Sequence, residues 1–109
     1  MNSDKYFQLV NDLFESRMGV HKKKAHDYAN DEDILSNFKR LAVAADALNI
    51  DVHSAVGYSL FMCVMKIDRL NNLISRGVSP VNESMDDTFI DIQNYVDLAR
   101  AILIDEQDK

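Results

Sequence analysis

Apolar residues recur at every third or fourth position through most of this chain, and that spacing limits its fold more than any other feature. Such a period matches the turn of an α-helix and predicts helices with one apolar face. The chain also has one proline and three glycines in 109 residues. A sheet protein of this size usually needs more turn residues than that. The sequence therefore predicts an all-α protein.

The pattern predicts a single domain over residues 1–109 with four helical segments. They cover residues 1–30, 31–49, 51–76 and 82–105, and the first includes a basic stretch. The spacing leaves open whether the first helix ends at Gly19 or runs through to Tyr28. Gly77 is expected to end the third helix, and either Asn82 or Ser84 is expected to cap the fourth. Short connections between four helices predict an up-down bundle.

The third predicted helix is apolar almost all round between Val52 and Met65. A helix of this kind lies at the centre of a bundle or in a subunit interface. A lone bundle this small has too few helices to cover it. We therefore expect a homo-oligomer, most simply a dimer, that buries Phe61, Met62 or Met65.

The charge balance narrows the classes of partner. The net charge is −6 with a pI near 4.8, which argues against direct DNA binding because phosphate contacts need a basic surface. Cys63 is the only cysteine, which excludes an intrachain disulfide and favours a reducing cytoplasm. We expect neither a signal peptide nor a membrane span, and hence a cytoplasmic protein.

Residues 21–30, HKKKAHDYAN, concentrate positive charge within this acidic chain. Lysine ammonium and imidazole groups both donate hydrogen bonds to phosphate oxygens. One interpretation is that Lys24, His26, Asp27 and Tyr28 face a phosphorylated ligand. The other is a solvated run of lysines that balances an acidic surface.

Lys66 and Arg69 form a second candidate group. They are three positions apart and share a face of the third predicted helix. Together they fit a phosphate group, or else ion pairs with acids of the neighbouring helix.

A row of acids forms the third group. Glu83, Asp87 and Asp91 follow one another at steps of four, and Tyr95 continues the row. Stacked carboxylates repel one another on an isolated helix, so a cation is expected to offset them. That cation is Lys66 and Arg69, or a bound Mg²⁺ that also bridges to substrate phosphates. The alternative is a cluster of acids favoured by the helix dipole.

Four blocks of the sequence together resemble a known family. These blocks are HKKKAHDYAN, LSNFKRLA, MKIDRLNNLI and ESMDDTFIDIQNY, within residues 20–104. They are similar to the phage and bacterial nucleotide modification associated domain 1 family, also called domain of unknown function 1599. The matching positions are Lys24, Asp27, Tyr28, Asn37, Phe38, Lys66, Arg69, Leu73, Glu83, Ser84, Asp87, Thr88, Asp91 and Tyr95. The resemblance implies a helical fold, a frequent phage origin and a role in nucleotide metabolism or DNA modification.

That family in turn looks like a remote relative of the MazG-like all-α nucleoside-triphosphate pyrophosphohydrolases. Those enzymes hold Mg²⁺ with a Glu-x-x-Glu pair on one helix and a Glu-x-x-Asp pair on the next. The resemblance puts Asp91 at the second Asp, but its partner position holds Thr88. The first pair has no counterpart, since Lys66 and Arg69 occupy that helix. The metal site of an active hydrolase is therefore incomplete, and enzymatic activity stays open.

Three hypotheses follow from the sequence. The leading one is a small phage-type protein that binds a phosphorylated nucleotide between helices, and acts by sequestering it or within nucleotide metabolism. Tyr28 or Tyr95 would stack on the base. The second is a Mg²⁺-dependent nucleoside-triphosphate pyrophosphohydrolase. The third is an acidic protein–protein inhibitor of a host factor.

Overall fold

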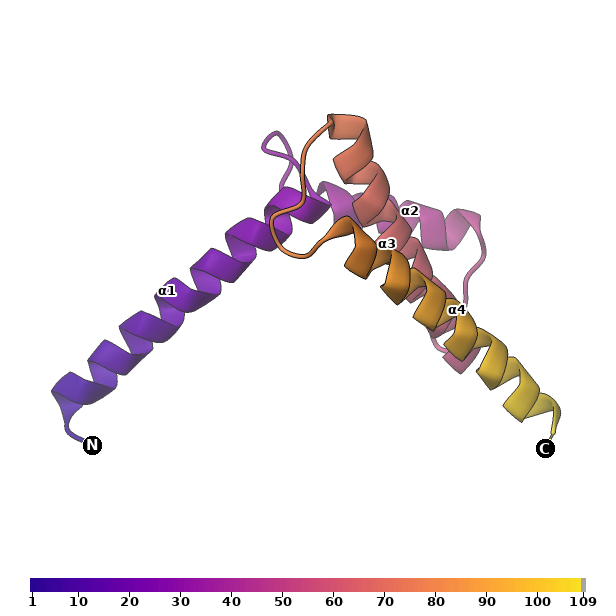
Figure 1. Cartoon of the computed structure of the whole chain (residues 1–109). Helices are drawn as coiled ribbons and strands as arrows, with labels where there is room; N and C mark the ends of the chain where they lie inside the picture. The colour runs from indigo at the N-terminus through magenta and orange to yellow at the C-terminus, as the bar shows by residue number, and fades with distance from the viewer. Residues whose placement is uncertain (109) are drawn as a thin grey trace.

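The computed structural model describes residues 1–108, which form four α-helices and no β-strand (Figure 1). The helices are α1 (Ser3–Tyr28), α2 (Ser36–Ala47), α3 (Ala55–Arg76) and α4 (Met85–Gln107). The predicted all-α fold is confirmed, and the contacts between helices are consistent with an up-down bundle. Among the described residues, no helix is long and apolar enough to cross a membrane. Lys109, the last residue of the predicted domain, lies outside the described residues.

Helix α1 continues past Gly19, the first of the two ends that the sequence left open. Asn2, and not Ser3, caps its start, and its side chain accepts a hydrogen bond from the backbone N–H of Lys5 at 2.9 Å. The helix then runs through Gly19 and the lysines to Tyr28. The candidate residues of the basic stretch therefore lie in its last turns.

Helix α2 begins five residues later than predicted because a polar turn precedes it. The side-chain oxygen of Asn30 accepts from the backbone N–H groups of Glu32 and Asp33 at 3.0 and 2.8 Å. The carboxylate of Asp33 accepts from the N–H of Leu35. The backbone N–H groups of this segment thus donate to side-chain oxygens in turns. Such turns compete with the start of a helix.

Helix α3 also begins late, at Ala55 where the prediction was residue 51. Ser54 is the cap and accepts from Gly57 N–H at 3.0 Å, while Asp51 forms the turn before it. The other two expected boundaries are confirmed. Gly77 ends α3 in the left-handed conformation with φ 65°, and Ser84 caps α4.

Helices α3 and α4 pack side by side in opposite directions (Figure 1). The Ser59 hydroxyl donates to the carbonyl of Tyr95 at 2.9 Å, and further along α3 Lys66 Nζ lies 3.3 Å from Asp91. Partner numbers fall on α4 as they rise on α3, as in an antiparallel pair. The end of α1 and helix α2 both contact α3, so α3 is the central helix.

Residues 1–24 extend away from the other helices and are all exposed (Figure 1). We call the helical part of this segment, residues 3–24, the arm, and residues 25–108 the body. The apolar stripe predicted for the first helix lies on the arm and is not buried within the chain. The arm gives the molecule extents of 57 × 39 × 26 Å.

The buried interior of the body contains as many polar as apolar residues. Among the described residues, the buried apolar ones are Ala29, Leu41, Cys63, Leu70, Leu73 and Ala99. The buried polar ones are Asp27, Asn37, Ser59, Arg69, Asn72 and Thr88. Ile34, Leu35 and Phe38, whose spacing predicts that they belong to the buried apolar face of the second predicted helix, are instead exposed. Polar contacts therefore define much of how the body is held together.

A methyl group added at Gly57 tests the turn before α3. A Cβ atom there would lie 1.8 Å from the backbone oxygen of Asp51, so the turn would have to move. We expect Gly57→Ala to lower the free energy of unfolding by roughly 1–3 kcal/mol, measured by urea denaturation. Gly19→Ala is the matched control, because nothing lies within 4 Å of its added Cβ. Equal effects of the two substitutions would contradict this account.

Candidate functional site

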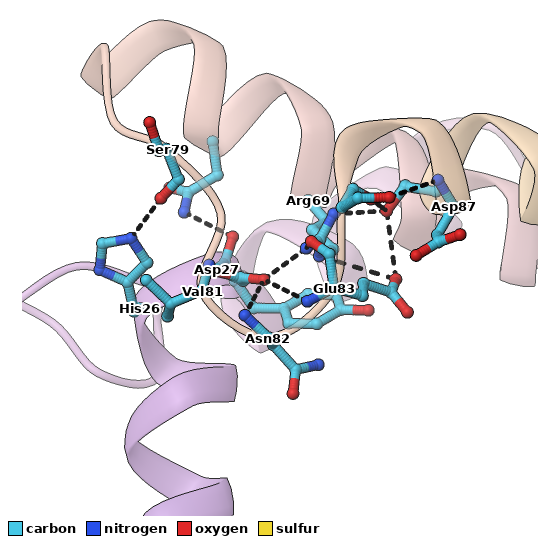
Figure 2. Close-up of polar contacts among 12 residues, drawn as sticks. His26, Asp27, Arg69, Ser79, Val81, Asn82, Glu83 and Asp87 are labelled. Carbon is cyan, nitrogen blue, oxygen red and sulfur yellow. Dashed lines mark hydrogen bonds and ion pairs between the residues drawn. The ribbon is translucent and has the colours of Figure 1, made fainter.

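The carboxylate of Asp27 lies fully buried where three segments of the body meet (Figure 2). It stands in the last turn of α1 and accepts hydrogen bonds from the backbone N–H groups of Val81 and Asn82 at 2.8 and 3.0 Å. It also forms an ion pair with the guanidinium of Arg69. Burial alone would raise the pKa of Asp27, but the N–H of Val81 and the Arg69 guanidinium lower it overall.

Arg69 on α3 is also fully buried and directs its donors at protein groups. Besides Asp27, it donates to the Thr88 hydroxyl and to the backbone carbonyl of Glu83 (Figure 2). Its Nε has no hydrogen-bond partner and lies 3.8 Å from the Glu83 carboxylate. A guanidinium with no exposed surface does not meet an external phosphate, so Arg69 acts within the structure.

Further side chains hold the last carbonyls of α1. Asn72 donates to the carbonyls of Asp27 and Ala29 at 3.1 and 3.0 Å. Arg76 donates to the carbonyl of His26 at 2.7 Å. The last carbonyls of a helix have no partner within it, and here α3 supplies the donors. This docking fixes the end of α1 against α3.

A second, partly exposed group surrounds Lys66. Its ammonium nitrogen lies 3.1 Å from the Tyr28 hydroxyl, 3.1 Å from Glu83 and 3.3 Å from Asp91. The side chains are 13% exposed for Lys66, 27% for Glu83 and 38% for Asp91. Burial would lower the pKa of Lys66, but hydrogen bonds from its ammonium to Tyr28 and Glu83 raise it above its ordinary value. We call Tyr28, Lys66, Glu83 and Asp91 the Lys66 cluster.

The Lys66 cluster lies next to a groove between α3 and α4. Met62 is one turn from Lys66 on α3, and Tyr95 is one turn from Asp91 on α4, so each pair shares a face. Both Met62 and Tyr95 line the groove, whose volume is about 760 Å³. Its other lining residues are Val52, His53, Ser54, Ala55, Tyr58, Ser59, Leu98 and Ile102. A charged group and an aromatic-lined hollow are thus neighbours on one surface.

The structure brings together most, but not all, of the residues singled out in the sequence. Those that converge are Asp27, Tyr28, Lys66, Arg69, Glu83 and Asp91, with Tyr95 one turn beyond. Lys24 is exposed on the arm. The ring of His26 donates to the Ser79 carbonyl at 2.8 Å (Figure 2). His26 also lines a separate cleft of about 350 Å³. Asp87 is exposed, and its backbone N–H donates to Ser84.

The expected row of three carboxylates on one helix does not form. Glu83 precedes the cap of α4, and its carboxylate turns to Lys66 and to the Thr88 hydroxyl. Within residues 1–108, no three His, Cys, Asp or Glu side chains are grouped so that they could hold a metal ion. The Lys66 ammonium lies between the carboxylates of Glu83 and Asp91. Lys66 is one of the side-chain cations that the sequence predicts for offsetting these acids.

Sequence reasoning missed Asn72 and Arg76 as partners of the α1 carbonyls. A signal for them exists, because Arg69, Asn72 and Arg76 are spaced by three and four and share one face of α3. It also missed Arg40, which pairs with Asp68 through two hydrogen bonds at 2.8 and 2.9 Å.

Comparison with models of known protein families, with curated proteins and with solved structures gave no match. The family resemblance described above rests on its sequence blocks alone and stays a prediction.

Asp27→Asn tests the buried ion pair. The substitution leaves the Arg69 charge buried and unpaired, which typically costs about 3–5 kcal/mol of unfolding free energy. Because the folded-state pKa of Asp27 lies below its ordinary 3.8, the pair stabilises the fold fully above that value. Its contribution is lost as pH falls through the folded-state pKa. Urea denaturation from about pH 7 to about pH 3, a range that includes the ordinary pKa of an aspartate, should show the difference in unfolding free energy between the two proteins shrinking in acid.

Asp33→Asn is the control for that experiment. Asp33 pairs with Lys39 at 2.7 Å on the surface, with side chains 39% and 66% exposed. Exposed pairs contribute about 0–1 kcal/mol. If both substitutions cost the same, or if the Asp27→Asn difference does not change with pH, the ion pair does not have the role assigned to it.

Proposed function

We propose that this protein binds a phosphorylated nucleotide along the α3–α4 surface. The phosphates would lie at the Lys66 cluster and the base in the neighbouring groove. One observation carries the proposal: Lys66 and Asp91, whose charged atoms lie 3.3 Å apart, each stand one helical turn from a residue that lines an aromatic-lined groove. The groove volume of about 760 Å³ falls within the range of small-molecule sites, roughly 300–1,000 Å³.

Lys66 is the phosphate ligand in this proposal. Its raised pKa keeps the ammonium charged at neutral pH, and its charge suits phosphate oxygens. The sequence predicts Arg69 as a phosphate ligand together with Lys66. Because Arg69 is fully buried, it has no phosphate-binding role in this proposal. Lys24 on the arm and His26 in its separate cleft have no contact with the ligand in this proposal.

Glu83 and Asp91 make the binding dependent on a divalent cation. Two carboxylates within 3.3 Å of Lys66 Nζ repel a bare phosphate. Mg²⁺ prefers carboxylate, water and phosphate oxygens, and a bound ion would turn this repulsion into a bridge. Nucleotide affinity should therefore rise when Mg²⁺ is added.

Tyr95 is the better of the two expected stacking residues. The Tyr28 ring already has Lys66 and Arg69 at 5.9 and 5.8 Å from its centroid, as in cation–π contacts. Tyr95 lines the groove with Tyr58, where an aromatic ring is open to a flat ligand.

Binding without turnover would let the protein sequester a nucleotide. The resemblance to a phage family suggests that such sequestration serves an anti-defence role.

Isothermal titration with mono-, tri- and cyclic nucleotides, with and without Mg²⁺, tests the proposal. We expect at least one nucleotide to bind, and Lys66→Met to weaken its affinity by tenfold or more. At 100–1,000 times the dissociation constant the ligand should also raise the unfolding free energy by about 3–4 kcal/mol.

Lys39→Met is the matched control, because Lys39 has a 66% exposed side chain and pairs with Asp33, which is not part of the Lys66 cluster. It should leave affinity unchanged. Titrations are done well below each variant's unfolding midpoint so that only folded protein is compared. If no nucleotide binds, or if Lys66→Met binds as tightly as the unchanged chain, the proposal fails.

A second candidate function is Mg²⁺-dependent hydrolysis of nucleoside triphosphates. It is favoured by the convergence of Glu83 and Asp91 on one point, the position of Lys66 Nζ. If Lys66 moved to a phosphate, both carboxylates would face the space that it leaves. Two carboxylates are few for the clustered metal ions of such enzymes.

Incubation with a panel of nucleoside triphosphates and Mg²⁺ tests this second function. The expected products are pyrophosphate and a monophosphate, and Asp91→Asn should reduce their release by a hundredfold or more. Asp97→Asn, on an exposed position of the same helix, is the control. If the unchanged protein releases no more product than Asp91→Asn does, hydrolysis is excluded and nucleotide binding remains the proposed function.

A further inference from the structure

The arm carries a continuous apolar stripe that nothing in the chain covers. Its members are spaced by three and four and face one side of α1. They are Tyr6, Phe7, Val10, Leu13, Phe14 and Met18, each between 40% and 66% exposed. A helix of a water-soluble protein usually buries such a stripe against another element.

The arm is also a poor candidate for a helix that stands alone. Isolated helices are marginal in water, and most helical stability in proteins comes from packing of the apolar face. Gly19 lies within the exposed part, and glycine in a helix interior costs about 1 kcal/mol relative to alanine. The arm therefore needs a covering surface.

The charges of the arm indicate which surface that is. Residues 1–15 contain Asp4, Asp12 and Glu15 against Lys5, a side-chain charge of −2. Residues 16–24 contain four basic side chains and no acid, a charge of +4. A helix that runs the opposite way with the same charges would place its acidic half beside this basic half. The arm of a second copy has both the stripe and this gradient.

We propose that the arm is a dimerisation element that pairs with the arm of a second copy in antiparallel orientation. The two-fold axis would pass near residue 12. Val10 of each copy would then face Phe14 of the other, and Tyr6 would face Met18. Asp4 of each copy would lie near Lys22 of the other, which explains the lysine run without a ligand for every lysine.

The area available is sufficient for a specific interface. Aromatic side chains bury about 150–250 Å² each, so six large side chains that are about half exposed offer on the order of 500–600 Å² per copy. Two copies give roughly 1,000–1,200 Å² in total, near the lower limit for specific interfaces. The arm points away from the body, so a second helix can reach its stripe (Figure 1).

The solution mass tests the pairing. Analytical ultracentrifugation should give twice the chain mass of 12.4 kDa for the unchanged protein. Phe7→Glu combined with Phe14→Glu should give the single-chain mass. Gln8→Glu combined with Ser16→Glu adds the same charge beside the stripe and should keep the dimer. A single-chain mass for the unchanged protein would overturn the proposal, as would a dimer unaffected by the Phe substitutions, which would point to the α3–α4 groove.

Disulfide cross-linking tests the orientation. In the antiparallel pair Asn11→Cys lies near the axis and should cross-link with itself under mild oxidation. Ser3→Cys should not, because about 18 residues at ~1.5 Å each separate the two copies of position 3. Cys63 is buried, so the unchanged chain serves as the background. Cross-linking at position 3 would mean a parallel pair, in which every position faces its own copy, and would overturn the proposed arrangement.

Discussion

The buried ion pair between Asp27 and Arg69 is the interaction on which the rest of the body depends. Removing two charges from water costs several kcal/mol for each ion, and only a full set of hydrogen bonds offsets that cost. Asp27 receives donors from the 81–82 backbone, and Arg69 reaches the Thr88 hydroxyl and the Glu83 carbonyl. The pair thus joins the end of α1, the middle of α3 and the start of α4. The Lys66 cluster forms because those three segments are fixed beside one another.

This arrangement separates two roles among residues that the sequence grouped together. Asp27 and Arg69 have no exposed surface and serve the fold. Lys66, Glu83 and Asp91 retain exposed surface, so they are the ones that a ligand can meet. The physical difference between the two groups is burial. Lys66 and Arg69 are only three positions apart on α3, yet Arg69 is internal and Lys66 is accessible. The residues that the sequence grouped together therefore do not all share one role.

The shape of the chain reflects how little apolar surface the body buries. Its interior contains small and polar side chains alongside Leu70 and Leu73, while large apolar side chains such as Phe38 and Phe89 remain exposed. The half-buried Phe61, Met62 and Met65, expected in a subunit interface, lie on the central helix. The arm adds an exposed apolar stripe that runs from Tyr6 to Met18. Self-association through the arm would give this chain the burial that its own body lacks, because a second copy supplies the missing helix face.

The sequence by itself determined the helices, and the tertiary structure decided what they face. Apolar spacing and scarce glycine and proline are local properties, so they identified four helices, the stop at Gly77 and the cap at Ser84. Helix starts at 36 and 55 were missed because polar turns at Asn30 and Asp51 compete with the helix. The sequence identified most residues of the candidate site. It did not show that the apolar stripe of the first helix has no partner in the same chain, because an amphipathic pattern does not say where its partner lies. Nor does a charged residue reveal its own burial, which depends on segments that are far apart in sequence. Only the packed structure placed Arg69 inside and Lys66 at the surface.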